Sequence, residues 1–213
     1  QFNYFINEQL INTKFRDGRK NFKLVKGAEK VFYNIDSTVG HDYVVIVEGE
    51  MDALSFVDAK IDSVVSVPNG ATLNRLNLDY LDNCIEYFDD KSKIIIAVDQ
   101  DEAGQNLQQE LIRRFGAEVC YTINFNDCKD ANEYMLRYGN TMLKRLVDTA
   151  SPVPLENVVT LKDVNDELQE FIHEGFKPGY QVGLNNFDNI FSTYTGQFIT
   201  VTGVPSSGKS DFV

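Results

Sequence analysis

The sequence predicts an α/β fold whose core is a mostly parallel, four-stranded sheet flanked by helices, with a small β-rich subdomain ahead of it. Two apolar, mostly β-branched runs, residues 44–47 and 94–98, are typical of parallel strands buried on both faces, and they predict strands over 44–47 and 93–98. Residues 63–67 and 118–123 are expected to form the second and fourth strands in chain order. Helical segments separate the four strands, and crossovers of this length connect parallel strands.

Helices are expected between and after these strands. The pattern predicts helices over residues 52–60, 73–88 and 102–115, and closing helices that begin with residues 131–138. Residues 68–71 are expected to form the loop that precedes the second helix. No internal repeat or low-complexity tract interrupts this alternation of strands and helices.

The chain is acidic, but its beginning is basic. The formal net charge is −12, whereas the first 30 residues hold seven basic and three acidic side chains and so carry +4, which leaves −16 for the remainder. Phenylalanines interleave with these cations, a composition that suits a surface meeting a nucleic-acid backbone or triphosphates. The alternative is a solvated β-hairpin whose aromatic side chains fill the core beneath it. Asp17 and Gly18 are a turn signal under either interpretation. The phenylalanines interleaved with or following these cations are Phe15, Phe22 and Phe32.

Acidic side chains follow two of the buried strands. Glu48 and Glu50 come after the first strand, and Asp99 and Asp101 come after the third. The carboxyl ends of strands in an open α/β sheet are where ligands bind. Several ionised carboxylates in one place require a compensating cation, and magnesium prefers such oxygen ligands. The sequence therefore predicts a magnesium site at this edge of the sheet.

Each acidic residue also has a purely structural interpretation. Glu48 followed by a glycine is a common turn, and Asp101 can cap the helix that begins near residue 102. Asp52, which extends the acidic cluster together with Glu50, can be an ordinary acid in the first turn of a helix. Asp130 can likewise cap the helix that follows it.

A second motif lies near the end of the chain. Gly203, Gly208, Lys209 and Ser210 have the spacing of a phosphate-binding loop and follow a strand-like run, residues 198–202. Backbone N–H groups would cradle a phosphate, Lys209 would neutralise it and Ser210 would ligate magnesium. Because little sequence follows this loop, we expect the residues after about position 180 to be poorly packed or covered by a neighbour. We also expect that this chain does not hydrolyse ATP.

Composition excludes several other classes of protein. The three cysteines are Cys84, Cys120 and Cys128, which are too far apart for Cys-x-x-Cys ligation, so a zinc site is not expected. Neither a signal peptide nor a transmembrane run is expected.

Three motifs together resemble a known family. An apolar strand ending in Glu-Gly, followed by a strand ending in Asp-x-Asp with Gly104 shortly after, resembles a TOPRIM domain, the metal-binding fold of primases, topoisomerases and some nucleases. Residues 128–133 (CKDANE) resemble a segment of phage replicative primases, and residues 196–210 resemble the opening of a ring-helicase motor. In this order the motifs resemble the bifunctional primase-helicases of bacteriophages, which are related to the mitochondrial Twinkle helicase.

The resemblance implies a DNA primase that makes RNA primers by two-metal nucleotidyl transfer with Mg²⁺ or Mn²⁺. It implies that Glu48, Asp99 and Asp101 are catalytic metal ligands, that Asp52 and Asp130 lie beside the metals, and that Glu48 either holds a metal or acts as the base. It further implies contacts with template and nucleotides from a set of residues ahead of and around the acidic cluster: Lys14, Arg16, Lys23, Gly70 and Lys129.

The resemblance also implies a domain plan and partners. The plan is a basic subdomain over residues 1–40, a TOPRIM domain over 41–149, a linker with an amphipathic helix over 150–180, and a truncated RecA-like domain over 181–213. Expected partners are a single-stranded DNA template, nucleoside triphosphates, ATP at the phosphate-binding loop and further copies in a hexameric ring, in the cytoplasm of a bacterial or phage-infected cell and without a membrane.

Phage primases of the resembling type usually carry a zinc-binding module before the catalytic domain. Because no such module is expected here, the resemblance implies that this chain is a piece of a longer protein. Two alternatives share the acidic residues: a TOPRIM nuclease, and a non-catalytic module that binds DNA or stabilises the ring of a Twinkle-like helicase.

Overall fold

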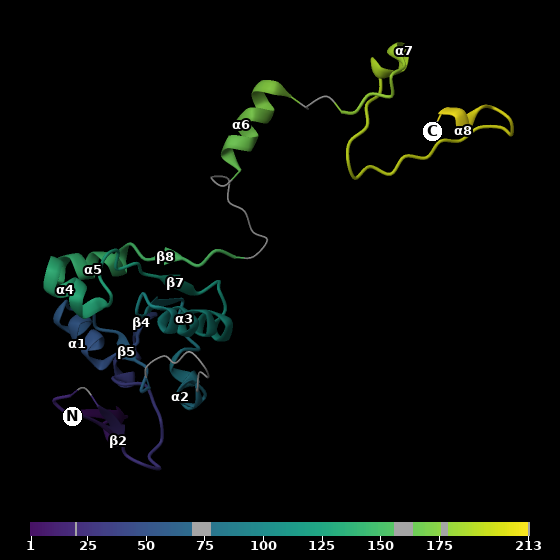
Figure 1. Cartoon of the computed structure of the whole chain (residues 1–213). Coiled ribbons are helices and arrows are strands. Elements are labelled where there is room, and N and C mark those ends of the chain that lie inside the picture. Colours follow the sequence, from purple (N-terminus) through teal and green to yellow (C-terminus); the bar gives the residue numbers. More distant parts are fainter. Residues whose placement is uncertain (20, 70–77, 156–163, 176–178, 213) are drawn as a thin grey trace. The chain divides into compact units, whose positions relative to one another are not determined.

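The structure is a computed structural model whose described residues form two compact units (Figure 1). The first unit comprises residues 1–158 and the second comprises residues 159–213. The described residues are 1–19, 21–69, 78–155, 164–175 and 179–212.

The first unit is built on a five-stranded sheet with the order β5-β4-β6-β7-β8. The first four strands in this order are mutually parallel, which confirms the four predicted strands, and β8 pairs with β7 in antiparallel orientation. Residues 151–152, expected to be linker, instead form β8 at the edge of the sheet. The strands are β4 (Tyr43–Val47), β5 (Val64–Ser66), β6 (Lys93–Ala97), β7 (Cys120–Thr122) and β8 (Ser151–Pro152).

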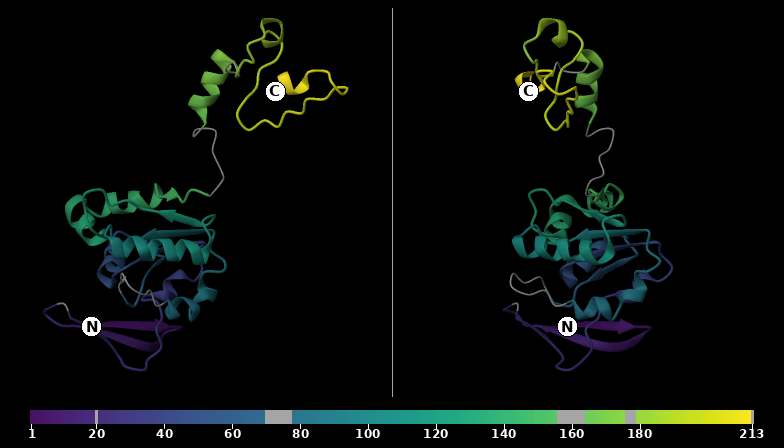
Figure 2. Two further views of the ribbon diagram at one scale, coloured as in Figure 1. Left: turned by 45° about the vertical axis from the view of Figure 1, so that its right-hand side comes forward. Right: turned by 90° about the vertical axis from the view of Figure 1, so that its right-hand side faces the viewer.

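Both faces of this sheet are buried, as the apolar runs predict. Alternate residues of β4 and β6 contribute to two separate apolar clusters. One cluster is completed by α2 (Asp79–Asp82) and α3 (Glu102–Phe115), and the other by α1, α4 and α5. The last three helices are α1 (Glu50–Asp58), α4 (Ala131–Tyr138) and α5 (Asn140–Asp148), so helices cover the sheet on both sides (Figures 1 and 2).

The helix predicted over residues 73–88 is not continuous in its described part. Residues 73–77 lie outside the described residues, and the remainder forms only α2 and the short 3₁₀ helix η2 (Ile85–Tyr87). The N–H of Cys84 donates to the carbonyl of Leu81, three residues earlier, and this tighter spacing continues at Tyr87. These three-residue hydrogen bonds replace the four-residue bonds of an α-helix, so the segment forms short helical turns instead of one continuous helix.

A small antiparallel sheet precedes the main one and includes the predicted hairpin. Its strands are β1 (Phe2–Ile6), β2 (Gln9–Arg16) and β3 (Phe22–Leu24), and the 3₁₀ helix η1 (Ile35–Thr38) follows them. The Asp17 carboxylate accepts hydrogen bonds from the N–H groups of Arg19 and Asn21, and these bonds close the turn between β2 and β3. Of the three phenylalanines that the sequence singled out, Phe32 fills the core, whereas Phe15 and Phe22 are exposed.

The second unit contains the short helices α6 (Asn165–Glu174), α7 (Asn185–Asp188) and α8 (Lys209–Phe212). The strand expected over residues 198–202 does not form, and Phe198 is 95% exposed. A strand needs neighbours to pair with and an apolar face to bury, and the described part of this unit offers neither. Most described side chains after residue 180 are exposed, in line with the poor packing expected there.

The amphipathic helix predicted within the linker is present as α6. Its expected first residues, 161–163, lie outside the described residues, and its apolar side chains Leu168, Phe171 and Ile172 are exposed. Every helix in the described part of the chain is too short or too polar to pass through a lipid bilayer.

Candidate active site

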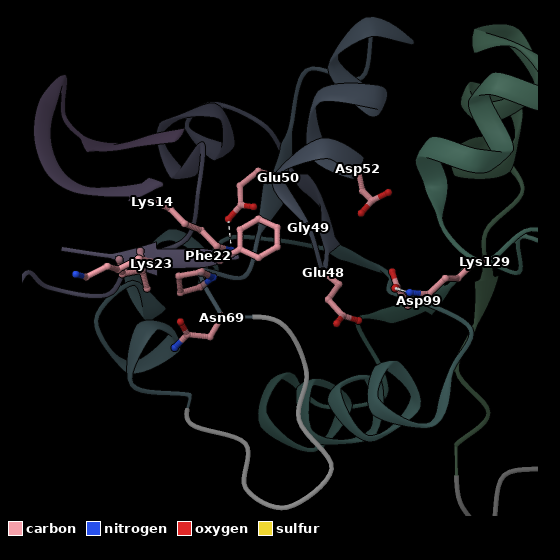
Figure 3. Close-up of a pocket in the computed structure, with 12 residues that line it drawn as sticks. Lys14, Phe22, Lys23, Glu48, Gly49, Glu50, Asp52, Asn69, Asp99 and Lys129 are labelled. Carbon is pink, nitrogen blue, oxygen red and sulfur yellow. Dashed lines mark hydrogen bonds and ion pairs between the residues drawn. The ribbon is translucent and has the colours of Figure 1, made fainter. Parts of the chain in front are cut away.

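The topology places two of the predicted acidic residues side by side. β4 and β6 are parallel neighbours, with Val47 opposite Ala97. Glu48 directly follows β4, and Asp99 is the second residue after β6, so both carboxylates emerge at the same edge of the sheet. Figure 3 shows the two side chains facing a common space.

This space is a cavity of about 630 Å³ that lies between the main sheet and the N-terminal sheet. Its walls carry the carboxylates of Glu48, Asp52 and Asp99 at one end and the paired Lys14 and Glu50 with one aromatic ring at the other (Figure 3). The lining residues are Lys14, Phe22, Lys23, Leu24, Glu48, Gly49, Glu50, Asp52, Pro68, Asn69, Asp99 and Lys129.

Asp52 contributes a third carboxylate from the first turn of α1. Its Oδ1 accepts a hydrogen bond of 3.0 Å from the backbone N–H of Asn132, which ties α1 to the start of α4. Burial raises the pKa of Asp52 to about 7, against the hydrogen bond from Asn132. Neighbouring carboxylates raise this pKa further, which shows that negative charge is concentrated here; they belong to Asp130, Asp99 and Glu48.

Gly49 leaves room for this arrangement between Glu48 and α1. A Cβ atom at Gly49 would lie 2.8 Å from Oδ2 of Asp52. A larger residue would therefore push the Asp52 carboxylate away from the position that it holds beside Glu48.

Asp99 is paired with Lys129. The Lys129 Nζ lies 3.0 Å from Oδ2 of Asp99 and 3.8 Å from Oδ2 of Asp101. Burial raises the pKa of Asp99, although its bond to Lys129 acts in the opposite direction. The lysine ammonium thus supplies a positive charge beside the carboxylates.

Asp101 and Asp130 both act as helix caps, the alternative that the sequence leaves open. Oδ1 of Asp101 accepts from the N–H of Gly104 at 2.9 Å, and Oδ1 of Asp130 accepts from the N–H of Glu133 at 2.8 Å. Neither residue lines the cavity. Each cap uses only Oδ1, and Oδ2 of Asp101 faces Lys129.

The described residues contain no group of three or more His, Cys, Asp or Glu side chains placed to hold one metal ion. Glu48, Asp99 and Asp101 therefore do not meet around a single point in this structure. The pair that the fold does bring into one cavity is Glu48 and Asp99, with Asp52 beside them.

Glu50 has a different role from the one that the sequence suggested. It does not extend the acidic cluster, because its Oε1 accepts from Lys14 Nζ at 2.7 Å and from the Tyr4 hydroxyl at 2.5 Å. Both charged side chains are nearly fully buried. Burial, together with the Glu50 carboxylate, raises the pKa of Tyr4 well above its usual value. This network joins β1 and β2 to the first turn of α1.

The other predicted contact residues are distributed unevenly. Lys14, Lys23 and Lys129 line the cavity, whereas Arg16 does not. Gly70 lies outside the described residues. Phe22 and Asn69 also line the cavity; the sequence singled out Phe22 only as one of several interleaved aromatics, and Asn69 only as part of a loop.

The motif that the sequence predicts to be a phosphate-binding loop lies in the second unit. Gly208 has a positive φ of 76°, and Lys209 and Ser210 begin α8, so a loop leads into a helix as the motif requires. A Cβ atom at Gly203 would lie 2.8 Å from Oγ of Ser207. The Lys209 ammonium donates to the carbonyl of Val204 at 3.0 Å.

Comparison with known proteins places this geometry in context. Residues 45–135 match a family model described as Toprim-like. The Twinkle homolog protein, chloroplastic/mitochondrial, of Arabidopsis thaliana is 32% identical over 231 residues, which cover 100% of this chain and 33% of that protein. The DNA helicase/primase of Enterobacteria phage T3 is 29% identical over 218 residues, 97% of this chain and 37% of the phage protein.

Among solved structures, the primase fragment of the bacteriophage T7 primase-helicase protein is similar with a TM-score of 0.58 and 29% identity. The match covers 68% of this chain and 60% of that one. The chain spans 33% to 51% of the length of the curated relatives that it matches.

Proposed function

We propose that this chain, which carries a Toprim-like domain related to those of primase-helicases, is the primase part of a longer primase-helicase and synthesises RNA primers on single-stranded DNA. The observation that carries the proposal is the pairing of Glu48 and Asp99 at one edge of the sheet, in a cavity that three lysines also line. The cavity therefore contains both carboxylates that can bind a metal ion and lysine ammonium groups that can bind phosphates.

The donor set fits a divalent ion. The carboxylate oxygens of Glu48, Asp99 and Asp52 are the hard ligands that Mg²⁺ and Mn²⁺ prefer. The raised pKa of Asp52, about 7, reflects burial and crowded negative charge that a divalent cation would relieve. Because no three of these side chains are already placed around one point in the described part of the chain, Glu48 and Asp99 would hold the ion between them. Asp52, and Oδ2 of Asp101 and of Asp130, would be further ligands only after side-chain movement.

The protein's own residues would position the reactants. The 3′-hydroxyl of the primer attacks the α-phosphorus of a nucleoside triphosphate, a new P–O bond forms and pyrophosphate leaves. When bound, divalent ions activate the hydroxyl and stabilise charge on the phosphates. Lys129, beside Asp99, would bind the phosphates, Lys14 and Lys23 would contact the nucleotide or template at the other end of the cavity, and Glu48 would either ligate an ion or accept the hydroxyl proton. Arg16, which is exposed beside the cavity, would contact the template backbone.

For the remainder of the chain we retain the predicted domain plan of residues 1–40, 41–149, 150–180 and 181–213. The loop that contains Lys209 would bind ATP in the whole protein, in which further copies would assemble into a ring.

The test is template-dependent incorporation of labelled ribonucleotides by the whole protein, with Mg²⁺ or Mn²⁺ present. Glu48→Gln and Asp99→Asn should each abolish primer synthesis while circular dichroism shows an unchanged fold. The matched control is Asp62→Asn, which removes an exposed carboxylate just before β5, at the opposite edge of the sheet. Wild-type primer yield from either site variant would contradict the proposal, and template cleavage in place of synthesis would favour a nuclease.

A further inference from the structure

A half-exposed aromatic side chain lines a cavity whose other lining residues are mostly charged or polar. Phe22, the first residue of β3, is 52% exposed and lines the cavity. Figure 3 shows its ring beside Lys14 and Gly49, on the N-terminal sheet side of the cavity. An exposed phenylalanine does not contribute to the core, so burial on folding does not explain its place.

Two cations hold this ring. Lys14 Nζ lies 4.9 Å from the ring centroid, and Arg16 Cζ lies 5.6 Å from it. Both distances are within the range of a cation–π interaction. Lys14 is itself held by Glu50 at 2.7 Å. The ring therefore lies against a buried ion pair.

The two ends of the cavity differ in chemistry. Glu48, Asp52 and Asp99 lie at one end, and Phe22 lies at the other, next to Lys23 (Figure 3). The volume of about 630 Å³ is in the range of small-molecule sites. A nucleoside triphosphate has matching ends: a polyanion that needs cations and a flat aromatic base that needs a stacking partner.

We propose that Phe22 is the platform on which the nucleobase of a bound nucleoside triphosphate stacks, with the triphosphate directed toward Glu48 and Asp99. This inference rests on the proposed function and adds the residue that binds the base. Because every base has a π-face, stacking is tolerant of sequence. Phe22 therefore binds all four nucleotides, and template pairing selects among them.

The absence of tryptophan from the chain makes a direct test possible. Phe22→Trp introduces a single tryptophan whose fluorescence a stacked base quenches. Each of the four ribonucleoside triphosphates should quench it saturably, whereas inorganic triphosphate, which has no base, should not. The matched control is Phe5→Trp, an exposed position on the same small sheet that does not line this cavity.

A second measurement guards against a tryptophan that disturbs the site. Phe22→Ala and Phe22→Leu should both raise the KM for every nucleotide by roughly 5- to 150-fold, the range expected for loss of one stacked base. Phe22→Tyr, which keeps an aromatic ring, should have a KM close to that of the wild-type protein. Circular dichroism of each variant checks that it is folded. If Phe22→Ala is misfolded, the comparison rests on Phe22→Leu and Phe22→Tyr.

The outcomes separate this inference from the proposed function. If wild-type protein primes and Phe22→Leu has an unchanged KM, the proposed stacking role of Phe22 is wrong and the primase assignment stands. Quenching by single-stranded DNA but not by nucleotides would assign the ring to the template instead and overturn the proposal. If wild-type protein makes no primer yet nucleotides quench Phe22→Trp, the base site stands and the primase assignment fails.

Discussion

The buried pair of Lys14 and Glu50 joins the N-terminal sheet to the acidic edge of the main sheet, and its loss should be costly. The perturbation is Glu50→Ala. It leaves the Lys14 ammonium without a counter-charge and the Tyr4 hydroxyl without its acceptor. The cavity wall that contains Lys14 and Phe22 should loosen as a result.

The magnitude follows from the burial of both partners. The side chains of Lys14 and Glu50 are 9% and 4% exposed. Breaking a buried pair by removing one member costs about 3–5 kcal/mol, because the remaining charge stays away from water without a partner. The unsatisfied Tyr4 hydroxyl, worth about 1–3 kcal/mol by itself, overlaps with this cost rather than adding to it. We expect Glu50→Ala to lower the free energy of unfolding by about 3–5 kcal/mol.

Urea unfolding followed by circular dichroism measures this change. The control is the double variant Lys14→Met with Glu50→Gln, which removes both charges and keeps an amide oxygen for Tyr4. Replacing both members of a buried pair is often nearly neutral, so the double variant should lie within about 2 kcal/mol of wild type. A loss below about 1 kcal/mol for Glu50→Ala, within the range of exposed ion pairs, would refute the reasoning.

Three further predictions concern the acidic edge and the core. Gly104→Ala should lower the free energy of unfolding by about 1–3 kcal/mol in urea titrations, because the added Cβ would lie 2.2 Å from the carbonyl oxygen of Asp99; an unchanged midpoint would contradict this contact. Asp101→Ala should cost about 1 kcal/mol through loss of the α3 cap, whereas Asp101→Asn, which can still cap, should cost less; equal losses would argue against the cap. Burial raises the pKa values of Cys84 and Cys120 to about 11, so the thiolate is scarce at pH 8 and iodoacetamide should modify both only after unfolding; rapid native modification would show that these thiols are accessible.

Much of the fold could be predicted because its signals are local. After their first residues, Tyr43 and Lys93, the runs that form β4 and β6 are apolar at every position, a pattern typical of a strand covered on both faces. Glu48 and Asp99 then follow from topology, since neighbouring parallel strands end at one edge of the sheet. The sequence therefore predicted that Glu48 and Asp99 lie close together, and the structure places both in one cavity; their catalytic role stays a prediction.

Features that depend on distant contacts could not be predicted. Lys14 and Glu50 are 36 positions apart, and nothing in the sequence near either residue indicates that the small sheet docks there. β8 has only two residues and includes a proline, so no periodicity marks it. Helix capping and metal binding both place an acid before a helix, so sequence alone could not separate these roles for Asp101.

The central claim is that the carboxylates of Glu48 and Asp99 hold a divalent ion at the edge of the sheet. Titration of the chain with Mn²⁺, followed by electron paramagnetic resonance of the free ion, tests it without any requirement for turnover. We predict that wild-type protein and Asp62→Asn bind Mn²⁺ equally, and that Glu48→Gln and Asp99→Asn bind it much more weakly. Equal Mn²⁺ affinity in all four proteins would contradict the claim.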